Sequence, residues 1–269
     1  MTEQIRRVAC ELVVDVVEPV RVSLQVAPCD EFPGFSESMQ ITSGGDPVAS
    51  TTVPIPGMSR VHVFSPPLGR LEIAYSATVT GRANLPKVAD WERIVYLRPS
   101  RYAESDRLAP MAQSEFGGIT DPGELVAAVS SWVGTRLEYV SGSSGPTDGA
   151  VDTMLHREGV CRDFAHLAVA LLRAMDVPAR LAAVYAPGLD PMDFHAVAEA
   201  AIGDTWHVVD ATLLAPRSTL VRISSGRDAA DTAFLSTTGG QADLVDFQVI
   251  ATVDGALPSD DVRELVSIT

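Results

Sequence analysis

Apolar and polar residues alternate along much of the first hundred positions, which is the pattern of strands that bury one face. Short runs rich in β-branched residues, separated by Pro- and Gly-bearing turns, cover 8–17, 20–28, 37–42, 60–64, 71–81 and 93–97. Strands this short and this closely spaced predict a β-sandwich. We therefore predict a β-rich N-terminal domain over residues 1–98.

Helical spacing replaces this alternation further along the chain. The segment 121–124, Asp-Pro-Gly-Glu, is typical of a helix start, with Asp as the cap and Pro at the first helical position. Apolar residues follow it at intervals of three and four as far as Leu137. A short helical turn is predicted over 151–156. The strongest helix of the chain is predicted to begin at Cys161 and to end before Pro178.

Strand-like segments follow the long helix at 179–186, 194–202 and 205–212. Gly203-Asp204 joins the last two as a tight hairpin, which pairs residues whose numbers sum to roughly 407. Helices that precede an antiparallel meander make an α+β fold, with the helices packed on the antiparallel sheet. We predict one such domain over residues 99–269.

Composition narrows the classes of protein that fit this pattern. The 269 residues are 46% hydrophobic and 20% charged, which is ordinary for a globular chain and excludes a disordered or fibrous one. No apolar run approaches the roughly 18 residues of a membrane span, and the first residues lack the apolar stretch of a secretion signal. We expect a protein of the cytoplasm that does not act at a membrane.

The net charge of −15 is unevenly distributed. Residues 1–100 carry 9 basic and 11 acidic side chains, whereas residues 101–269 carry 11 and 24. An acidic surface repels phosphate backbones and anionic lipids, so neither nucleic acid nor a membrane surface is expected as a partner. The sequence leaves the oligomeric state open.

Three cysteines, Cys10, Cys29 and Cys161, are too few and too widely spaced for a disulfide framework or a zinc site. They fit a reducing compartment. His195, Glu199 and His207 are the nearest approach to a set of metal ligands, but they do not have the spacing of a known metal motif. We expect no metal and no other cofactor.

Cys161, His195 and Asp210 form the candidate catalytic site. A thiol at the start of a helix has a lowered pKa, and the N–H groups there can stabilise an oxyanion. The hairpin register brings Asp210, at the end of one strand, close to His195 at the start of the neighbouring strand. A cysteine, a histidine and an aspartate together supply a nucleophile, a base and a group that orients the base.

The segments 159–166 (GVCRDFAH), 193–196 (DFHA) and 206–212 (WHVVDAT) resemble the transglutaminase-like superfamily, in particular bacterial transglutaminase-like cysteine peptidases. The resemblance implies a papain-like core after a β-rich N-terminal region. It implies that Cys161 attacks an amide carbonyl, that His195 relays the proton and that Asp210 holds the imidazole. Val197 departs from the aromatic residue usual in the family at this position.

Three functions remain open at this stage. A hydrolase would act on a peptide or amide substrate through a Cys161 thioester, and we favour it because water is always available. An acyltransferase would pass the same acyl group to an amine. A degenerate scaffold would only bind a partner. For the oxyanion of either enzyme, Trp132 and Tyr139 lie upstream as candidate sources of a second donor.

Overall fold

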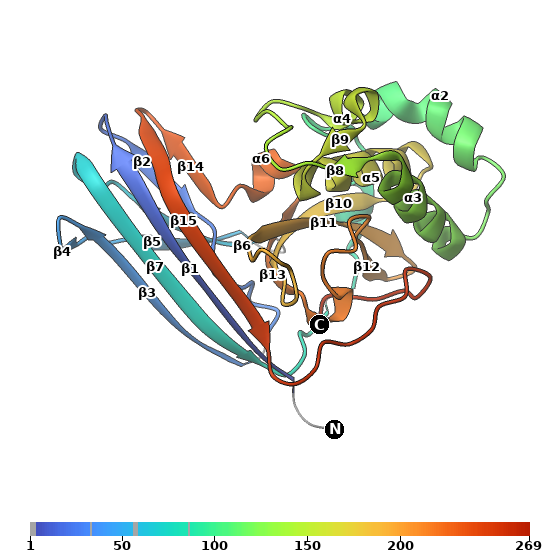
Figure 1. Cartoon of the computed structure of the whole chain (residues 1–269). Coiled ribbons are helices and arrows are strands. Elements are labelled where there is room, and N and C mark those ends of the chain that lie inside the picture. The colour runs from blue at the N-terminus through green and yellow to red at the C-terminus, as the bar shows by residue number, and fades with distance from the viewer. Residues whose placement is uncertain (1–3, 33, 56–58, 86) are drawn as a thin grey trace.

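Two antiparallel sheets pack together in the N-terminal part of the computed structural model, which describes residues 4–32, 34–55, 59–85 and 87–269 (Figure 1). The first sheet has the order β15 (Ala242–Val253), β1 (Ile5–Val16), β7 (Gly69–Thr80), β3 (Phe35–Ser43) and β4 (Asp46–Pro47). The second has the order β14 (Leu235–Thr238), β2 (Arg21–Leu24), β6 (Ser59–Phe64) and β5 (Thr51–Ile55). Alternate residues of β1 are buried, as the sequence pattern predicts.

The edge strands β14 and β15 come from the far end of the chain. β15 pairs with β1 from Arg6 opposite Val253 to Val16 opposite Ala242, and β14 pairs with β2. Figure 1 shows both strands beside the N-terminal strands. The sequence pattern predicts no strand after residue 212, where the structure has β13 (Val221–Gly226), β14 and β15. The domain boundary between residues 98 and 99 stays a prediction. β14 and β15 follow this boundary in the chain and pair with strands that precede it.

Helices and a four-stranded antiparallel sheet form the rest of the molecule. The sheet has the order β12 (Thr205–Val209), β11 (Phe194–Ile202), β10 (Ala179–Tyr185) and β13 (Val221–Gly226). The helices are α1 (Asp90–Val95), α2 (Ser105–Phe116), α3 (Pro122–Arg136), α4 (Ala150–His156), α5 (Cys161–Ala174) and α6 (Ala229–Thr232). Helix α5 packs on β10 and β11, and α2, α3 and α4 pack on α5. The predicted α+β fold is confirmed.

The local signals for helix start and hairpin register are confirmed. Asp121 caps α3 by accepting a hydrogen bond from the Glu124 N–H at 2.8 Å. The hairpin between β11 and β12 pairs Ile202 with Thr205 and Ala198 with Val209. Both pairs have the predicted sum of 407, because a two-residue turn leaves only one register.

The prediction of a strand over 93–97 is wrong, because α1 continues to Val95 and a turn follows it. Its β-branched residues favour a strand locally. The Glu92 carboxylate, however, accepts a hydrogen bond from the Ala89 N–H at 2.8 Å and closes the first turn of a helix. The same carboxylate forms an ion pair with the buried Arg180, so a tertiary contact favours the helix.

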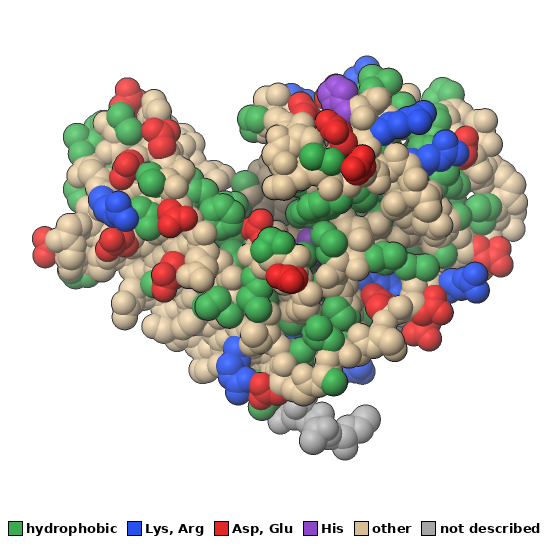
Figure 2. All heavy atoms as spheres, in the orientation of Figure 1, with side chains coloured by type: hydrophobic (Ala, Val, Ile, Leu, Met, Phe, Trp, Pro, Cys, Tyr) green, Lys and Arg blue, Asp and Glu red, His purple; other side chains and the backbone are tan. Residues whose placement is uncertain are grey.

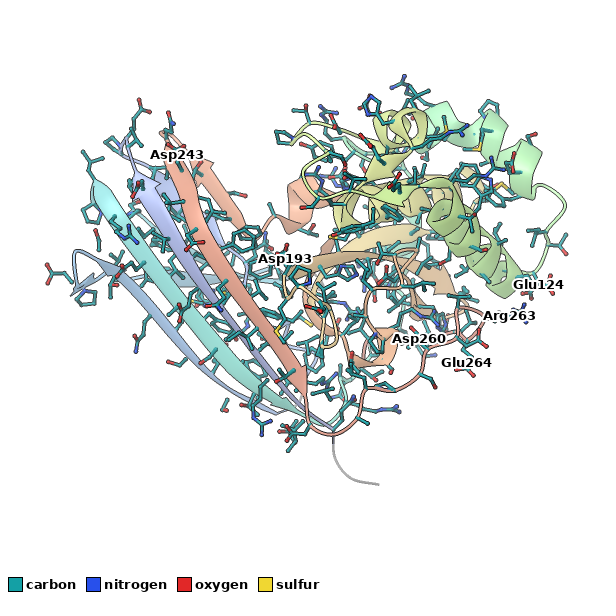
Figure 3. The ribbon with its side chains drawn as sticks, viewed as in Figure 1. Glu124, Asp193, Asp243, Asp260, Arg263 and Glu264 are labelled. Atoms are coloured by element: carbon teal, nitrogen blue, oxygen red, sulfur yellow. The ribbon has the colours of Figure 1, made fainter. Side chains whose placement is uncertain are left out.

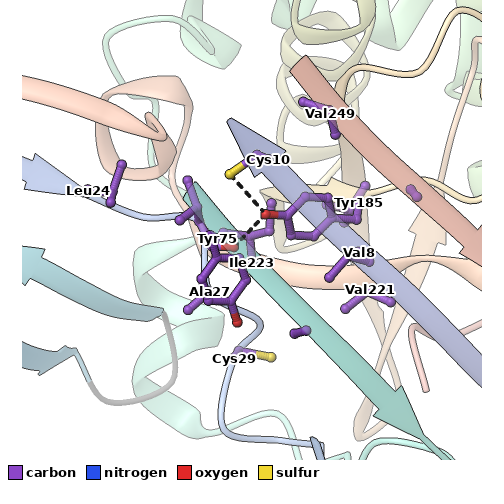
Figure 4. Packing of buried hydrophobic residues seen from close by; sticks show 14 of the residues in the cluster. Val8, Cys10, Leu24, Ala27, Cys29, Tyr75, Tyr185, Val221, Ile223 and Val249 are labelled. Carbon is purple, nitrogen blue, oxygen red and sulfur yellow. Dashed lines mark hydrogen bonds between the residues drawn. The ribbon is translucent and has the colours of Figure 1, made fainter. Parts of the chain in front are cut away.

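One hydrophobic core extends from the N-terminal sheets to the sheet of β10–β13. It includes residues of β1, β2 and β7 together with residues of β10, β11, β12 and β13. Figure 4 shows Tyr185 of β10 beside Cys10 of β1 in this core. The Tyr185 hydroxyl donates to the Val26 carbonyl at 2.8 Å, so a buried hydrogen bond also connects the two regions.

A buried ion network connects the same two regions. Glu199 of β11 accepts hydrogen bonds from Arg180 and from Arg222, and Arg222 also contacts Glu31 of the N-terminal part. Except for Glu31, these side chains are almost fully buried. Because each buried charge has a partner of opposite sign, removing one partner would leave a costly unpaired charge.

The C-terminal segment returns across the sheet of β10–β13. Asp260, labelled in Figure 3, accepts hydrogen bonds from the buried Arg217. The Val208 N–H donates to the Val266 carbonyl at 2.7 Å. Among the described residues, no helix has both the length and the apolar character that crossing a bilayer requires.

Candidate active site

Cys161 is the first residue of α5, and the start of this helix fixes its position. Val160 has the extended backbone of a cap, and its N–H donates to Asp163 Oδ2 at 2.9 Å. Asp163 is buried and also accepts from the Arg162 guanidinium. The Cys161 side chain stays partly exposed. Its thiol therefore lies at the N-terminus of the helix, near the positive end of the helix dipole.

His195 and Asp210 come together from neighbouring strands. His195 is the second residue of β11, and Asp210 directly follows β12. His195 Nε2 and Asp210 Oδ2 are 2.8 Å apart, and both side chains are almost fully buried. The second carboxylate oxygen, Oδ1, accepts from the Thr212 N–H at 2.9 Å and from its hydroxyl at 2.6 Å. Both oxygens of Asp210 are thus held in place.

Opposing effects set the protonation of this pair. Burial disfavours a charged imidazole, but the Asp210 carboxylate, its hydrogen bond and the neighbouring Cys161 outweigh burial and raise the pKa of His195. Burial likewise disfavours the Asp210 carboxylate, and His195 and Thr212 outweigh it and lower the pKa of Asp210. The surroundings therefore favour an imidazolium beside a carboxylate.

Tyr139 lies beside Cys161 because β8 (Glu138–Tyr139) pairs with β9 (Glu158–Gly159), two residues before the cysteine. Its hydroxyl lies near enough to Cys161 for the thiol to affect its ionisation. Burial and the nearby thiol raise the pKa of Tyr139 to about 12, so the phenol stays protonated at neutral pH. Trp132, the other upstream candidate, donates instead to Glu115 at 2.9 Å.

A cavity of about 420 Å³ opens beside Cys161 and His195. Residues of β10, of β11 and of the segment 229–236 line it. Figure 2 shows the surface hollowed between the N-terminal sheets and the helices. The candidate nucleophile thus faces space that a substrate could fill.

Polar contacts that sequence reasoning missed hold the segment 229–236 against the site. His166 Nε2 accepts a hydrogen bond from the Ala229 N–H at 3.1 Å, and its ring stacks on Tyr102. Asp228 caps α6 through the Ala230 N–H and also accepts from the Tyr102 N–H. These residues are far apart in sequence, so no local pattern could have shown that they meet.

Two further polar groups border the site. Asp193 precedes β11 and lies on the side that faces the N-terminal sheets (Figure 3). Burial raises the pKa of Asp193, although the Phe194 N–H and the charge of His195 oppose the shift. Arg162 donates to the Ser144 hydroxyl and to the Gly145 carbonyl, so its guanidinium fixes a loop beside the cavity.

The set His195, Glu199 and His207 does not converge on one point. Both oxygens of Glu199 pair with arginines, and His195 pairs with Asp210. Within the described ranges of the chain, no group of three or more His, Cys, Asp or Glu side chains is arranged to hold a metal ion.

Known proteins resemble this chain in sequence and in structure. The model of the transglutaminase-like superfamily matches residues 110–211, which include Cys161, His195 and Asp210. The crystal structure of a "putative cysteine protease" from Cytophaga hutchinsonii superposes with a TM-score of 0.89. It is 33% identical, and the match covers 98% of this chain and 96% of that one.

Mycobacterial proteins are more distant relatives. An uncharacterized protein of Mycobacterium leprae is 25% identical over 165 residues, 58% of this chain and 59% of that protein. An uncharacterized protein of Mycobacterium tuberculosis is 43% identical over 65 residues, 24% of this chain and 19% of that protein. The chain thus spans about three fifths of the first of these relatives and about one fifth of the second.

Proposed function

Because the chain belongs to the transglutaminase-like superfamily, we propose that it is a thiol enzyme that cleaves amide or peptide bonds through a thioester on Cys161. Cys161 is the nucleophile, His195 transfers protons, and Asp210 orients the imidazole. One observation carries the proposal: a thiol at a helix start lies beside a buried imidazole, which is itself hydrogen-bonded to a buried carboxylate.

The first half-reaction forms the thioester. Because Asp210 bonds to Nε2 of His195, Nδ1 remains to take the thiol proton. The thiolate then attacks the carbonyl carbon of the substrate. As the C–N bond breaks, the imidazolium returns the proton to the leaving nitrogen, and an amine departs. The raised pKa of His195 supports this cycle, since the imidazole then holds the proton taken from the thiol until the leaving nitrogen receives it.

The oxyanion of the tetrahedral intermediate needs hydrogen-bond donors. The Cys161 N–H at the helix start is one, and we assign the Tyr139 hydroxyl as the second because Tyr139 lies beside Cys161. When a carbonyl oxygen enters, the phenol can donate to it. Tyr139→Phe should lower kcat about a hundredfold if the hydroxyl has this role.

The second half-reaction transfers the acyl group to water, so the products are a carboxylic acid and the free thiol. His195 takes a proton from the water as the water attacks the thioester, and then returns this proton to the sulfur. The cavity beside Cys161 is open to solvent on one side, which supports hydrolysis. An amine acceptor would need a site that holds it and excludes water.

Variants of the proposed triad test the assignment. Cys161→Ala and His195→Ala should each lower turnover of a peptide-library substrate by at least about a thousandfold, and the double variant should be little worse. Asp210→Asn should slow the enzyme and keep the fold. Cys29→Ala is the matched control, because Cys29 is buried away from the site. Independent, multiplicative losses would contradict a single catalytic unit.

Product analysis separates hydrolysis from transfer and from a non-catalytic scaffold. The acyl-enzyme is formed, and putrescine is added at increasing concentrations. We expect the free acid to remain the main product at millimolar amine. Saturable capture by micromolar putrescine would establish an acyltransferase. If no thioester forms with any member of the library while Cys161 remains reduced, the scaffold alternative is favoured.

We also propose the cytoplasm as the site of action. Cys10, Cys29 and Cys161 are all free thiols, which suits a reducing compartment. Fractionation of the native cells with an antibody against the chain tests this location.

A further inference from the structure

The cavity beside Cys161 has an apolar lining that the cleavage chemistry itself does not require. Ala183 of β10 and Ala196 of β11 are paired in register, and both line it. Ala229, Ala230 and Ala233 contribute further methyl groups to the lining. Side chains this small leave space where larger residues would fill it.

Aromatic rings form one wall of this cavity. Phe194 precedes His195, and its ring stacks on Phe234 with centroids 4.6 Å apart. Phe247 of β15 extends the cluster, with its centroid 6.4 Å from that of Phe194. Phe194 and Phe234 are only partly buried, so their rings offer an apolar surface to a bound group.

Charge is nearly missing from the lining. Of the described residues that line the cavity, Arg162 and His195 have basic side chains, and none is an aspartate, a glutamate or a lysine. The Arg162 guanidinium is engaged by Ser144, Gly145 and Asp163, and His195 by Asp210. A charged side chain placed in the cavity would therefore lose hydration without gaining a partner.

We propose that this cavity selects substrates by binding a large apolar side chain, aromatic or aliphatic, of the residue at or next to the scissile carbonyl. The inference rests on the proposed function, since it assumes that Cys161 attacks that carbonyl. Phe234 and Ala183 determine the specificity, Phe234 by packing against the bound side chain and Ala183 by leaving room for it. The volume of about 420 Å³ is within the usual range for ligand pockets.

Alkylating peptides that differ in one residue test the selection. The probes are acetyl-Xaa-Ala- and acetyl-Ala-Xaa-fluoromethyl ketones, with Phe, Leu, Gln, Asp or Lys as Xaa. The thiolate forms a C–S bond while fluoride leaves, and intact mass reports the rate. Each rate is divided by the iodoacetamide rate of the same variant, which corrects for thiol reactivity.

In the wild type, Phe and Leu probes should react about tenfold or more faster than Asp and Lys probes in one of the two series. Phe234→Ala and Ala183→Leu should each reduce the advantage of Phe to about threefold or less. Trp91→Ala, which removes an exposed ring on α1, is the matched control and should keep the full preference.

Several outcomes would overturn the inference and leave the proposed function intact. These are equal rates for every Xaa, a preference for Gln, Asp or Lys, or an unchanged preference for Phe in both pocket variants. Failure of the proposed function has a different signature, which is a Cys161 that reacts with iodoacetamide no faster than Cys10. In that case calorimetry of acetyl-Phe-Ala-amide against acetyl-Asp-Ala-amide with the Cys161→Ala variant still decides whether the cavity prefers the apolar group.

Discussion

Cys161 differs from Cys10 and Cys29 in both exposure and surroundings. Cys10 and Cys29 are 1% and 5% exposed, and burial raises their pKa values to about 11 and about 12. Cys161 is partly exposed at a helix start and lies beside His195. Only the thiolate reacts with an alkylating agent, so these surroundings separate the three thiols.

We predict that limiting iodoacetamide at pH 6–7 labels Cys161 well before the other two cysteines. The expected rate ratio is at least about a hundredfold, because the pKa values of the two buried thiols, about 11 and about 12, stand against an ordinary thiol value of 9.0. Peptide mapping by mass spectrometry measures it. His195→Ala should slow the labelling of Cys161 and leave that of Cys10 and Cys29 unchanged, and equal labelling of all three cysteines in the wild type would refute the assignment of the nucleophile.

His166 provides a pH-dependent term in stability. Burial lowers the pKa of His166 to about 3, Arg162 and Arg173 add to this effect, and Asp228 opposes it. The folded protein therefore keeps a neutral imidazole at pH values where the unfolded chain binds a proton. The sign follows: the contribution is full above the ordinary pKa of 6.5 and is lost as the pH falls toward 3.

We predict that His166→Gln makes the free energy of unfolding less dependent on pH below pH 7. Glutamine can accept the Ala229 N–H but does not titrate in this range. Between pH 7 and pH 5 the free energy of unfolding of the wild type should fall by about 2 kcal/mol more than that of the variant. This figure follows from about 1.36 kcal/mol for each pH unit below the ordinary pKa of histidine. Urea unfolding at the two pH values measures the difference, and parallel losses in both proteins would exclude this role.

At the scale of elements, the start of α5 depends on a close approach by Gly159. A Cβ at this position would meet the Asp163 Cβ at 2.7 Å. Asp163 cannot easily move aside, because its carboxylate accepts the Val160 N–H and holds the helix cap. The geometry of Cys161 is therefore coupled to a residue two positions earlier.

We predict that Gly159→Ala shifts the helix start and slows alkylation of Cys161 about tenfold or more, with a stability loss of about 1–3 kcal/mol from overpacking. Gly118→Ala is the control, because nothing lies within 4 Å of the added Cβ there. Iodoacetamide kinetics and urea unfolding of both variants provide the comparison. Full reactivity in Gly159→Ala would mean that the helix start tolerates the extra methyl group.

Elements with local signals could be predicted, and elements built by distant contacts could not. The cap at Asp121 and the turn at Gly203-Asp204 fix α3 and the β11–β12 register within a few residues. β15 depends instead on pairing with β1, more than two hundred positions away. The same holds for the candidate site. Family motifs in the sequence identify Cys161 and its partners, whereas the segment 229–236, which includes Phe234, reaches the cavity through tertiary packing that no motif indicates.

At the scale of the whole molecule, the N-terminal sheets and the sheet of β10–β13 share one hydrophobic core. Tyr185 of β10 bonds to the Val26 carbonyl, and Arg222 of β13 contacts both Glu31 and Glu199. β14 and β15 add strands from beyond residue 234 to the N-terminal sheets. The domain boundary between residues 98 and 99 stays a prediction. Because the two parts share a core, we expect them to unfold together.

We predict one cooperative unfolding transition, because separating the parts would expose their common core and leave buried ion pairs unmatched. The chain offers separate probes for each part. In a Cys161→Ala, Trp91→Phe background, Trp132 and Trp206 report the second part by fluorescence, and pulse labelling of Cys10 and Cys29 reports the N-terminal part.

The two probes should give the same urea midpoint and the same m-value, since a single transition exposes both sets of groups at once. Tyr185→Phe removes the donor to the Val26 carbonyl and should lower the free energy of unfolding by about 1–3 kcal/mol. Both midpoints should therefore fall by the same urea concentration. Thr135→Ala, on the exposed side of α3, is the control and should leave both midpoints nearly unchanged. Midpoints that separate, or a Tyr185→Phe effect confined to one probe, would identify two independently folding domains instead.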